Sequence, residues 1–188
     1  MQSYFMIADH PALDFLNTVV IEDGVETDRF QNDEDVLAWL HQAGFASRTE
    51  RPLKAGRLLA AARELREAVR TAIKDRKQRK PIRIEVLNRF LSQLHHHVAL
   101  VQQRGQPLAF HTNIIARDEI ELLAQVAESA AHLLVDTDFD LVRQCEDESC
   151  ILWFLDITKA HRRRWCSMST CGNRQKVQAY RARKATGS

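Results

Sequence analysis

The four cysteines are the residues of this chain best suited to chemistry, and they form two pairs with the same internal spacing. Four residues separate Cys145 from Cys150, four separate Cys166 from Cys171, and fifteen lie between the pairs. Two such pairs can each fold back so that all four sulfurs face one ion, and thiolate is a preferred donor for structural Zn²⁺. The spacing therefore predicts one structural zinc ion on these four residues.

The residues around the cysteines support a metal site. Small and polar residues fill the loop inside each pair, which suits tight turns, and the apolar run 151–155 between the pairs predicts a strand. Trp153 and Trp165 could fill a miniature core. A region of about 45 residues is too small to be stable by apolar burial alone, so a metal ion would complete it. Spacing alone also fits an iron–sulfur cluster, but a structural role favours zinc.

The charge distribution points to an anionic partner for the C-terminal region. Residues 141–188 carry ten Lys or Arg against four Asp or Glu, whereas residues 1–140 carry 17 against 21. From Lys159 onward there are nine basic residues and no acidic one. Such a segment can neutralise phosphates and release counterions, which favours nucleic acid as the partner. A solvated terminal helix, or a patch for an acidic protein, would show the same charges.

A basic helix is predicted after the last cysteine, over residues 173–184. Asn173 is a good N-cap residue, and Val177 and Tyr180 are spaced to dock the helix on the zinc core. Gln175 and Gln178 could read base edges. The candidate nucleic-acid contacts are Arg162, Arg163, Arg164, Asn173, Arg174, Lys176, Arg181, Arg183 and Lys184.

The beginning of the chain places polar residues among apolar ones. A helix is expected to start near Pro11, which suits the first helical position, and its apolar side is expected to include Val19 and Val20. On that helix Asp14 and Asn17 lie three residues apart and share a side. Buried polar groups need partners, so these two either cross-link the core or, with His10, line a ligand pocket.

The remaining pattern predicts a mainly α fold with a small β component. Apolar residues recur at steps of three and four, as on amphipathic helices, and alternate or cluster around Gly105 as in a hairpin. The expected elements are a helix capped by Asn32 or Asp33 and ended by Gly44, helices at 53–77, from Pro81 and at 117–135, and a hairpin over 98–110.

The acidic loop 136–140 is the expected domain boundary, with an α-rich domain at 1–138 and a treble-like zinc finger, made of a β-hairpin and the basic helix, at 139–188. There is no apolar run of about 18 residues and no signal peptide, so we expect a cytoplasmic protein. The adjacent histidines 95–97 point about 100° apart on a helix and do not converge on a metal. We find no catalytic triad order, phosphate loop or paired carboxylates, and expect no enzymatic activity.

The C-terminal sequence closely resembles the CGNR-type zinc finger, through the four cysteines and the run Cys171-Gly172-Asn173-Arg174. The opening His10-Pro-Ala-Leu-Asp14-Phe-Leu-Asn17 is similar to the N-terminal domain that precedes this finger in bacterial stress-induced transcription regulators. Together the two similarities cover nearly the whole chain. The resemblance implies zinc on the four cysteines and DNA binding by the basic residues. Ile151 stands where many relatives have Gly, at a position that is not a ligand.

We therefore interpret the chain as a bacterial DNA-binding transcription regulator. Its N-terminal domain would sense a small-molecule effector or form a homodimer, because one small finger reads few bases. The alternatives are a zinc-scaffolded module that binds protein or RNA, and a ligand-binding domain with an accessory finger. If the finger is a separate unit, Cys166→Ser should unfold it and leave the N-terminal helices intact.

Overall fold

The computed structural model has a mainly α architecture, as predicted. In the part that it describes, three two-stranded antiparallel sheets accompany the helices. None of the helices described is both long and apolar enough to span a lipid bilayer. The histidines 95–97 lie outside the described residues, which are 4–45, 48–50, 52–94, 98–102, 105, 107–112 and 116–186.

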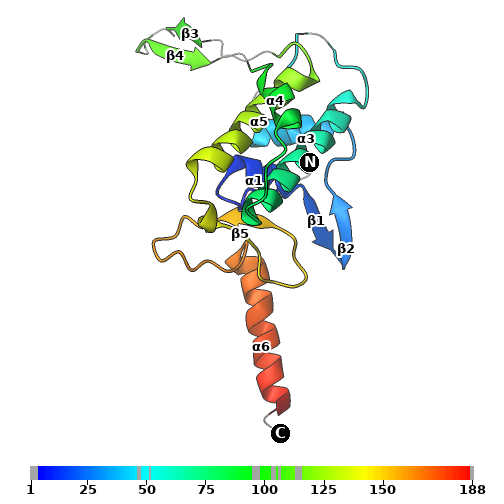
Figure 1. The fold of residues 1–188 in the computed structure, drawn as a ribbon, viewed down its shortest axis with the longest axis vertical. Coiled ribbons are helices and arrows are strands. Elements are labelled where there is room, and N and C mark those ends of the chain that lie inside the picture. The colour runs from blue at the N-terminus through cyan, green and yellow to red at the C-terminus, as the bar shows by residue number, and fades with distance from the viewer. Residues whose placement is uncertain are drawn as a thin grey trace.

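A helical body holds most of the core (Figure 1). Its helices are α1 (Pro11–Leu16), α2 (Asp33–Gln42), α3 (Arg57–Lys77), α4 (Glu85–Leu91) and α5 (Glu119–Asp136). The short helix α1 lies at the centre and contacts both α3 and α5. Its Phe15 packs against Trp39 and Phe30, with ring centroids 5.1 and 5.8 Å apart, and all three side chains are fully buried. The first helix is therefore the middle of the core.

Local sequence signals determine where α2 begins and ends. The Asn32 side chain accepts a hydrogen bond from the Asp35 amide at 2.8 Å, and the Asp35 carboxylate accepts one from the Asn32 amide at 3.3 Å. This reciprocal capping box satisfies two amides that the first turn leaves unpaired. After the last turn, Gly44 has a φ of 79°, the left-handed conformation that glycine adopts at little cost. Both predicted ends of this helix are confirmed.

The first helix is shorter than its apolar pattern suggests. Val19 and Val20 belong to strand β1 (Val19–Glu22), which pairs with β2 (Val25–Asp28). The turn between the strands has two residues, Asp23 and Gly24, with φ of 51° and 81°. An Asp-Gly pair in a two-residue turn is a strong hairpin signal. The Asp23-Gly24 pair therefore indicated a hairpin in the sequence, although Val19 and Val20 also fit the apolar pattern of the preceding helix.

The structure corrects the start of the helix expected from Pro81 and confirms the hairpin expected over residues 98–110. The helix expected from Pro81 begins only at Glu85, because Ile82 packs against the core from a non-helical segment. The expected hairpin is confirmed: β3 (Val98–Val101) pairs antiparallel with β4 (Ala109–Thr112), and Gly105 in the connection has a φ of 82°. This hairpin projects from the body at the end opposite to the C-terminus (Figure 1).

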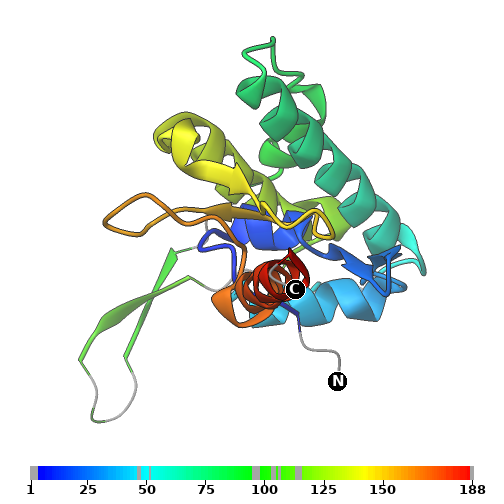
Figure 2. The same ribbon diagram turned by 90° about the horizontal axis from the view of Figure 1, so that it is seen from below.

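The C-terminal region consists of a small hairpin and a basic helix, as predicted. Strands β5 (Val142–Gln144) and β6 (Trp153–Leu155) pair antiparallel after a short 3₁₀ turn at Phe139–Leu141. A π-helical turn, Met168–Gly172, leads into α6 (Asn173–Thr186). Figure 2, which looks from below, shows α6 almost end-on beneath the body. This helix extends away from the rest of the molecule (Figure 1).

One hydrophobic core runs through the expected domain boundary at 138–139. The same buried cluster contains Leu134 of α5, Val142 of β5, Phe154 of β6 and Cys166. Helix α1 contacts β6 as well as its helical neighbours. The amide of Leu155 also donates to the carbonyl of Ala8 at 2.8 Å. The cysteine region is therefore packed onto the helical body.

Asn17 joins the two parts through hydrogen bonds. Its side-chain amide donates to the carbonyl of Trp153 at 2.8 Å, and its oxygen accepts from the Trp153 amide at 2.9 Å. Both bonds are buried, so Asn17 satisfies a strand residue that would otherwise lack partners. Asp14 bonds within the N-terminal part, where it accepts from the amides of Ile7 and Ala8 at 2.9 and 3.0 Å. Burial raises the pKa of Asp14 to about 6.

We expect Asn17→Ala to destabilise the whole protein. The substitution leaves the buried amide and carbonyl of Trp153 without partners, which should lower the free energy of unfolding by about 2–4 kcal/mol. Urea denaturation followed by circular dichroism measures this loss. The exposed Asn88 on α4 provides the control, since Asn88→Ala should change stability by less than about 0.5 kcal/mol. Equal losses of stability in the two variants would contradict the role of Asn17 as the buried partner of Trp153.

Candidate metal centre and nucleic-acid interface

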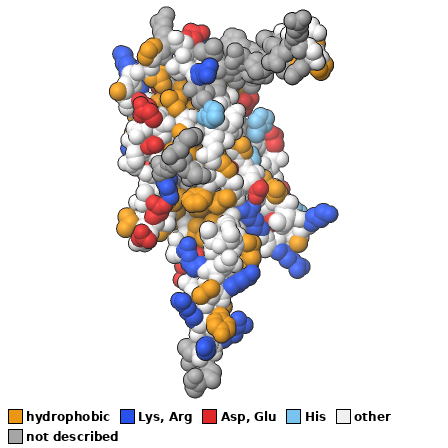
Figure 3. Space-filling model, turned by 180° about the vertical axis from the view of Figure 1, so that it is seen from behind, with side chains coloured by type: hydrophobic (Ala, Val, Ile, Leu, Met, Phe, Trp, Pro, Cys, Tyr) orange, Lys and Arg blue, Asp and Glu red, His pale blue; other side chains and the backbone are white. Residues whose placement is uncertain are grey.

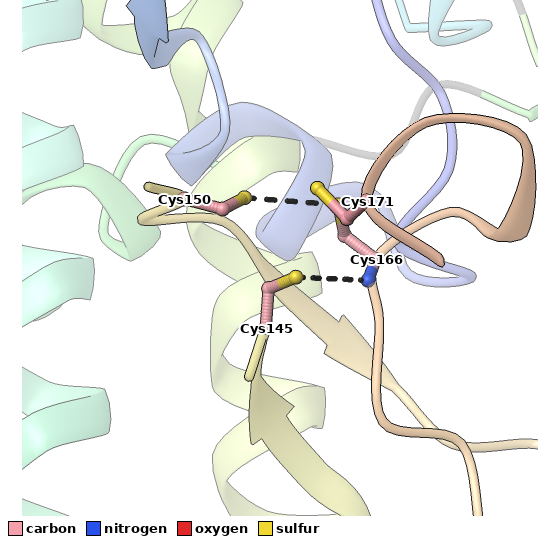
Figure 4. Close-up of side chains that lie close together, drawn as sticks. All are labelled: Cys145, Cys150, Cys166 and Cys171. Carbon is pink, nitrogen blue, oxygen red and sulfur yellow. Dashed lines mark hydrogen bonds between the residues drawn. The ribbon is translucent and has the colours of Figure 1, made fainter. Parts of the chain in front are cut away.

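The four cysteine sulfurs converge on one point at the edge of the body. Cys145 follows β5, Cys150 precedes β6, and Cys166 and Cys171 flank the turn that leads into α6. Figure 4 shows the four side chains directed toward one another from two separate loops. All four sulfurs lie within 4.8 Å of each other. Residues up to 26 positions apart in the sequence are thus brought to one site.

The spacing of the sulfurs fits a tetrahedral zinc ion. Zn–S bonds of about 2.3 Å at tetrahedral angles place sulfurs about 3.8 Å apart. The Sγ atoms of Cys150 and Cys166 are 3.8 Å apart, and those of Cys166 and Cys171 are 3.6 Å apart. Four thiolates with no free position are typical of a structural zinc site. These residues would hold one Zn²⁺, and a bound ion would cross-link the two loops.

The first loop is shaped by the side chain of Asp147. Its Oδ1 accepts hydrogen bonds from the Ser149 amide at 3.0 Å and the Ser149 hydroxyl at 2.7 Å. The amide of Cys150 donates to the Asp147 carbonyl at 2.8 Å. Aspartate commonly stabilises a tight turn in this way. The turn brings Cys150 back toward Cys145, so that both sulfurs of this pair can face one ion.

The second loop contacts the first through its backbone. The amide of Cys166 donates to the sulfur of Cys145, with N···S at 3.4 Å. The amide of Glu146 donates to the carbonyl of Arg164 at 2.9 Å. An N–H group directed at sulfur stabilises its thiolate form. The two loops are therefore held together before any metal contribution is counted.

Protonation of the cluster depends on the close approach of the sulfurs. Burial and the nearby sulfurs of Cys150 and Cys145 together raise the pKa of the Cys171 thiol to about 12. Hydrogen bonding with Cys145 and Cys150 raises the pKa of Cys166, whereas hydrogen bonding with Cys150 and Cys166 lowers the pKa of Cys145. Without a cation, the thiols of Cys166 and Cys171 therefore resist losing their protons. A divalent cation supplies the positive charge that makes four adjacent thiolates stable at neutral pH.

The three residues after Cys171 each make a specific contact at the base of α6. A Cβ on Gly172 would lie 2.9 Å from the sulfur of Met168, so no larger residue fits without a shift. The Asn173 side chain donates to the Ser169 carbonyl at 3.2 Å. Asn173 itself is helical and continues the π turn, so its predicted role as N-cap is wrong. The helical path already starts after Ser167.

Arg174 ties α6 to the first cysteine loop. Its Nη1 lies 3.4 Å from a carboxylate oxygen of Asp147 and donates a hydrogen bond to the Ser149 hydroxyl. The Asp147 carboxylate is buried, whereas about half of the Arg174 side chain is exposed. Together with Cys171, this contact sets the direction in which the helix leaves the metal centre.

Arg163 is a structural residue although the sequence placed it among the nucleic-acid contacts. Its Nη2 donates to the carbonyls of Ile7 and Cys166 at 2.7 and 2.6 Å. The guanidinium lies 4.3 Å from the ring centroid of Phe154 and forms an ion pair with Asp9. Its side chain is only 17% exposed. Arg163 therefore joins the finger to the N-terminal segment and has little surface left for a phosphate.

The neighbouring arginines remain accessible. Arg162 is exposed and forms no ion pair with another residue that the structure describes. Arg164 is exposed as well, pairs with Glu146 at 2.5 Å and lies over the Trp165 ring. An exposed ion pair of this kind is worth about 0–1 kcal/mol, so a phosphate could replace it. The three adjacent arginines thus divide into one buried and two surface residues.

Helix α6 is exposed on all sides beyond its first turn. Lys176, Arg181, Arg183 and Lys184 are all on the surface. Val177 and Tyr180 are 47% and 60% exposed, so the prediction that they dock the helix on the zinc core is wrong. Helix α6 extends away from the body, and both residues are exposed on it (Figure 1).

His10, Asp14 and Asn17 line none of the four best-formed cavities in the described part of the structure. His10 caps α1, with its Nδ1 accepting from the Ala12 amide at 3.3 Å, and burial lowers its pKa. Asp14 and Asn17 are buried and bonded to backbone groups. These contacts favour the interpretation that Asp14 and Asn17 cross-link the core over the interpretation that they line a ligand pocket with His10.

We expect Cys166→Ser to lose zinc and to destabilise the N-terminal helices as well as the finger. Because the core is continuous, the melting temperature monitored at 222 nm should fall by about 10 °C or more. Elemental analysis and thermal denaturation test this expectation. Thr170→Ala, in the same loop, should retain the metal. A mutant that loses zinc and leaves the helical transition unchanged would show that the finger unfolds by itself.

Comparison with known families agrees with this geometry. The model of the ABATE family, described as "Putative stress-induced transcription regulator", matches residues 9–137. The model of the CGNR zinc finger matches residues 142–184, which include all four cysteines. No curated protein matches the chain. The chain therefore belongs to the ABATE family of putative stress-induced transcription regulators and carries a CGNR zinc finger at its C-terminal end.

Proposed function

We propose that this protein binds duplex DNA, with Arg162 and the basic side chains of α6 as the main contacts. The observation that carries the proposal is the position of α6. This helix projects from the metal centre, is exposed around its circumference, and carries five Lys or Arg and no Asp or Glu. Figure 3 shows blue Lys and Arg side chains distributed along it. The role proposed is binding, with no catalytic step.

The dimensions of α6 suit the major groove. Its 14 residues would extend over about 21 Å, at 1.5 Å per residue. An α-helix with its side chains is about 10–12 Å wide, which matches a major groove of about 12 Å. Lys and Arg would neutralise phosphates at the groove edges. Gln175 and Gln178 would then be available to contact base edges.

The marginal stability expected of a projecting helix such as α6 also supports a binding role. An isolated helix of this length is marginal in water, and packing normally stabilises it. In the described part of the structure, Cys171 and the contact of Arg174 with Asp147 hold the base of the helix, and most of its remaining side chains are exposed. Insertion into a groove would add packing contacts along this exposed part. A bound zinc ion would keep the base in place while this happens.

The proposal predicts a steep salt dependence of DNA binding. We expect about four to six phosphates to be neutralised, with a log–log slope of roughly −0.9 for each. Fluorescence anisotropy with a labelled random duplex, measured between about 50 and 200 mM salt, gives this slope. The triple variant Lys176→Gln, Arg181→Gln and Lys184→Gln should reduce the slope by about 3.

The matched control removes the same charge from the helical body. Arg48, Lys54 and Lys74 are exposed there, and their replacement by Gln should leave the slope nearly unchanged. A salt-insensitive complex, or equal losses in both triple variants, would exclude α6 as the main contact. Stronger competition by single-stranded RNA than by duplex DNA would favour an RNA-binding module.

A second pair of variants separates binding from folding. Arg162→Gln should weaken DNA binding and reduce the salt slope by about 1 with no loss of stability. Arg163→Gln should lower the free energy of unfolding by about 2–4 kcal/mol, because it leaves buried carbonyls without donors. Denaturation and anisotropy on the same samples distinguish the two effects. The assignment fails if Arg163→Gln is fully stable and only DNA binding falls.

A further inference from the structure

A cavity of about 240 Å³ lies beside the metal centre, between the helical body and the base of α6. Figure 3 shows hydrophobic side chains gathered in this region, where the projecting helix meets the body. One wall comes from the N-terminal segment, β1 and the residue before β6. Apart from Glu22 of β1, its side chains are apolar and belong to Phe5, Ile7, Val20, Ile21 and Leu152.

The opposite wall belongs to the metal centre. Three of the four cysteines line it, together with hydroxyl residues of both loops and Arg174. The hydroxyl residues are Ser149, Ser167, Ser169 and Thr170. The cavity is therefore apolar on one side and rich in hydrogen-bonding groups on the other. Such a combination is typical of sites for small organic molecules.

The charges around the cavity disfavour a charged occupant. Four thiolates and one Zn²⁺ carry a net charge of −2, which would repel an anion. The positive charge of Arg174 is already balanced in part by Asp147, 3.4 Å away. A cation is attracted by the metal centre, but it would lose hydration against the apolar wall, and Glu22, the carboxylate on the lining, already forms an ion pair with Arg29. Uncharged molecules avoid both penalties.

We propose that this cavity binds a small, uncharged aromatic molecule that carries one hydroxyl or N–H group. The ring would pack on the side chains of Ile21 and Leu152, and the polar group would bond to the hydroxyls of the facing loops. A cavity of about 150 Å³ is large enough for benzene, so this cavity accommodates a substituted single ring.

The position of the cavity gives its occupant a role in regulation. The molecule would contact β1 on the body and, at the same time, Arg174 at the base of α6. It would therefore favour one direction of the helix over others. This consequence for DNA binding rests on the proposed function, but occupation of the cavity does not.

Fluorine NMR on the full-length, zinc-loaded protein tests the proposal directly. The probe is 4-fluorophenol, with 4-fluorobenzoate and 4-fluorobenzylammonium as charged analogues of similar size. We expect saturable binding of the phenol, with a Kd on the order of 1 mM or lower for so small a molecule. Both charged probes should bind at least about tenfold more weakly, which corresponds to one desolvated or repelled charge.

Two substitutions on opposite walls place the probe in this cavity. Ile21→Trp and Ser169→Trp should each fill it and weaken phenol binding at least about tenfold. The matched control is Val25→Trp on the same hairpin, since Val25 is 65% exposed and does not line the cavity. Zinc content and thermal denaturation show whether each variant is folded.

The phenol-binding experiments can fail or succeed independently of the DNA-binding experiments. Absence of saturable phenol binding up to about 10 mM, or unchanged affinity in both folded cavity variants, would overturn the proposal. Tighter binding of either charged probe would overturn the chemical class. Phenol binding that leaves DNA affinity unchanged would retain the site and remove its regulatory role.

Discussion

The constraint on which the rest of this structure depends is the convergence of four sulfurs within 4.8 Å. Two loops must turn sharply to meet it. The Asp147 side chain stabilises the first turn, and the amide of Gly172 donates to the carbonyl of Ser167 in the second. A zinc ion supplies the charge that allows four adjacent thiolates to coexist. The same convergence places Cys171 two residues before α6 and so determines where the basic helix starts.

The metal centre is one of several features that fix the position of the finger and α6 on the helical body. Asn17 bonds to both backbone groups of Trp153, and Arg163 reaches from the second loop to the N-terminal segment. These polar contacts are buried beside a shared apolar core, so the finger cannot move independently without breaking them. The body and the base of α6 therefore form one rigid frame. A change at their junction, including occupation of the adjacent cavity, can affect the helix that extends from it.

Much of the fold could be predicted because its signals are local. The ends of α2 follow from Asn32 and Gly44, and the helical periodicity of α3 and α5 appears directly in the spacing of their apolar residues. Where prediction failed, two local signals competed or a tertiary contact prevailed. The valines after α1 fit a helix or a strand equally well, and Ile82 packs on the core outside the predicted helix.

For the site, the sequence by itself determined the chemistry. Four cysteines at matched spacing specify a four-thiolate metal site and its ligands, because thiolate preference and loop closure are properties of short segments. Only the tertiary structure decided which polar residues are exposed. Arg162 and Arg163 are adjacent and chemically identical, yet one is on the surface and the other bonds to Ile7 from 156 positions away. Likewise, the partner of Asn17 is 136 positions distant. Burial depends on packing between distant segments, which no local pattern records.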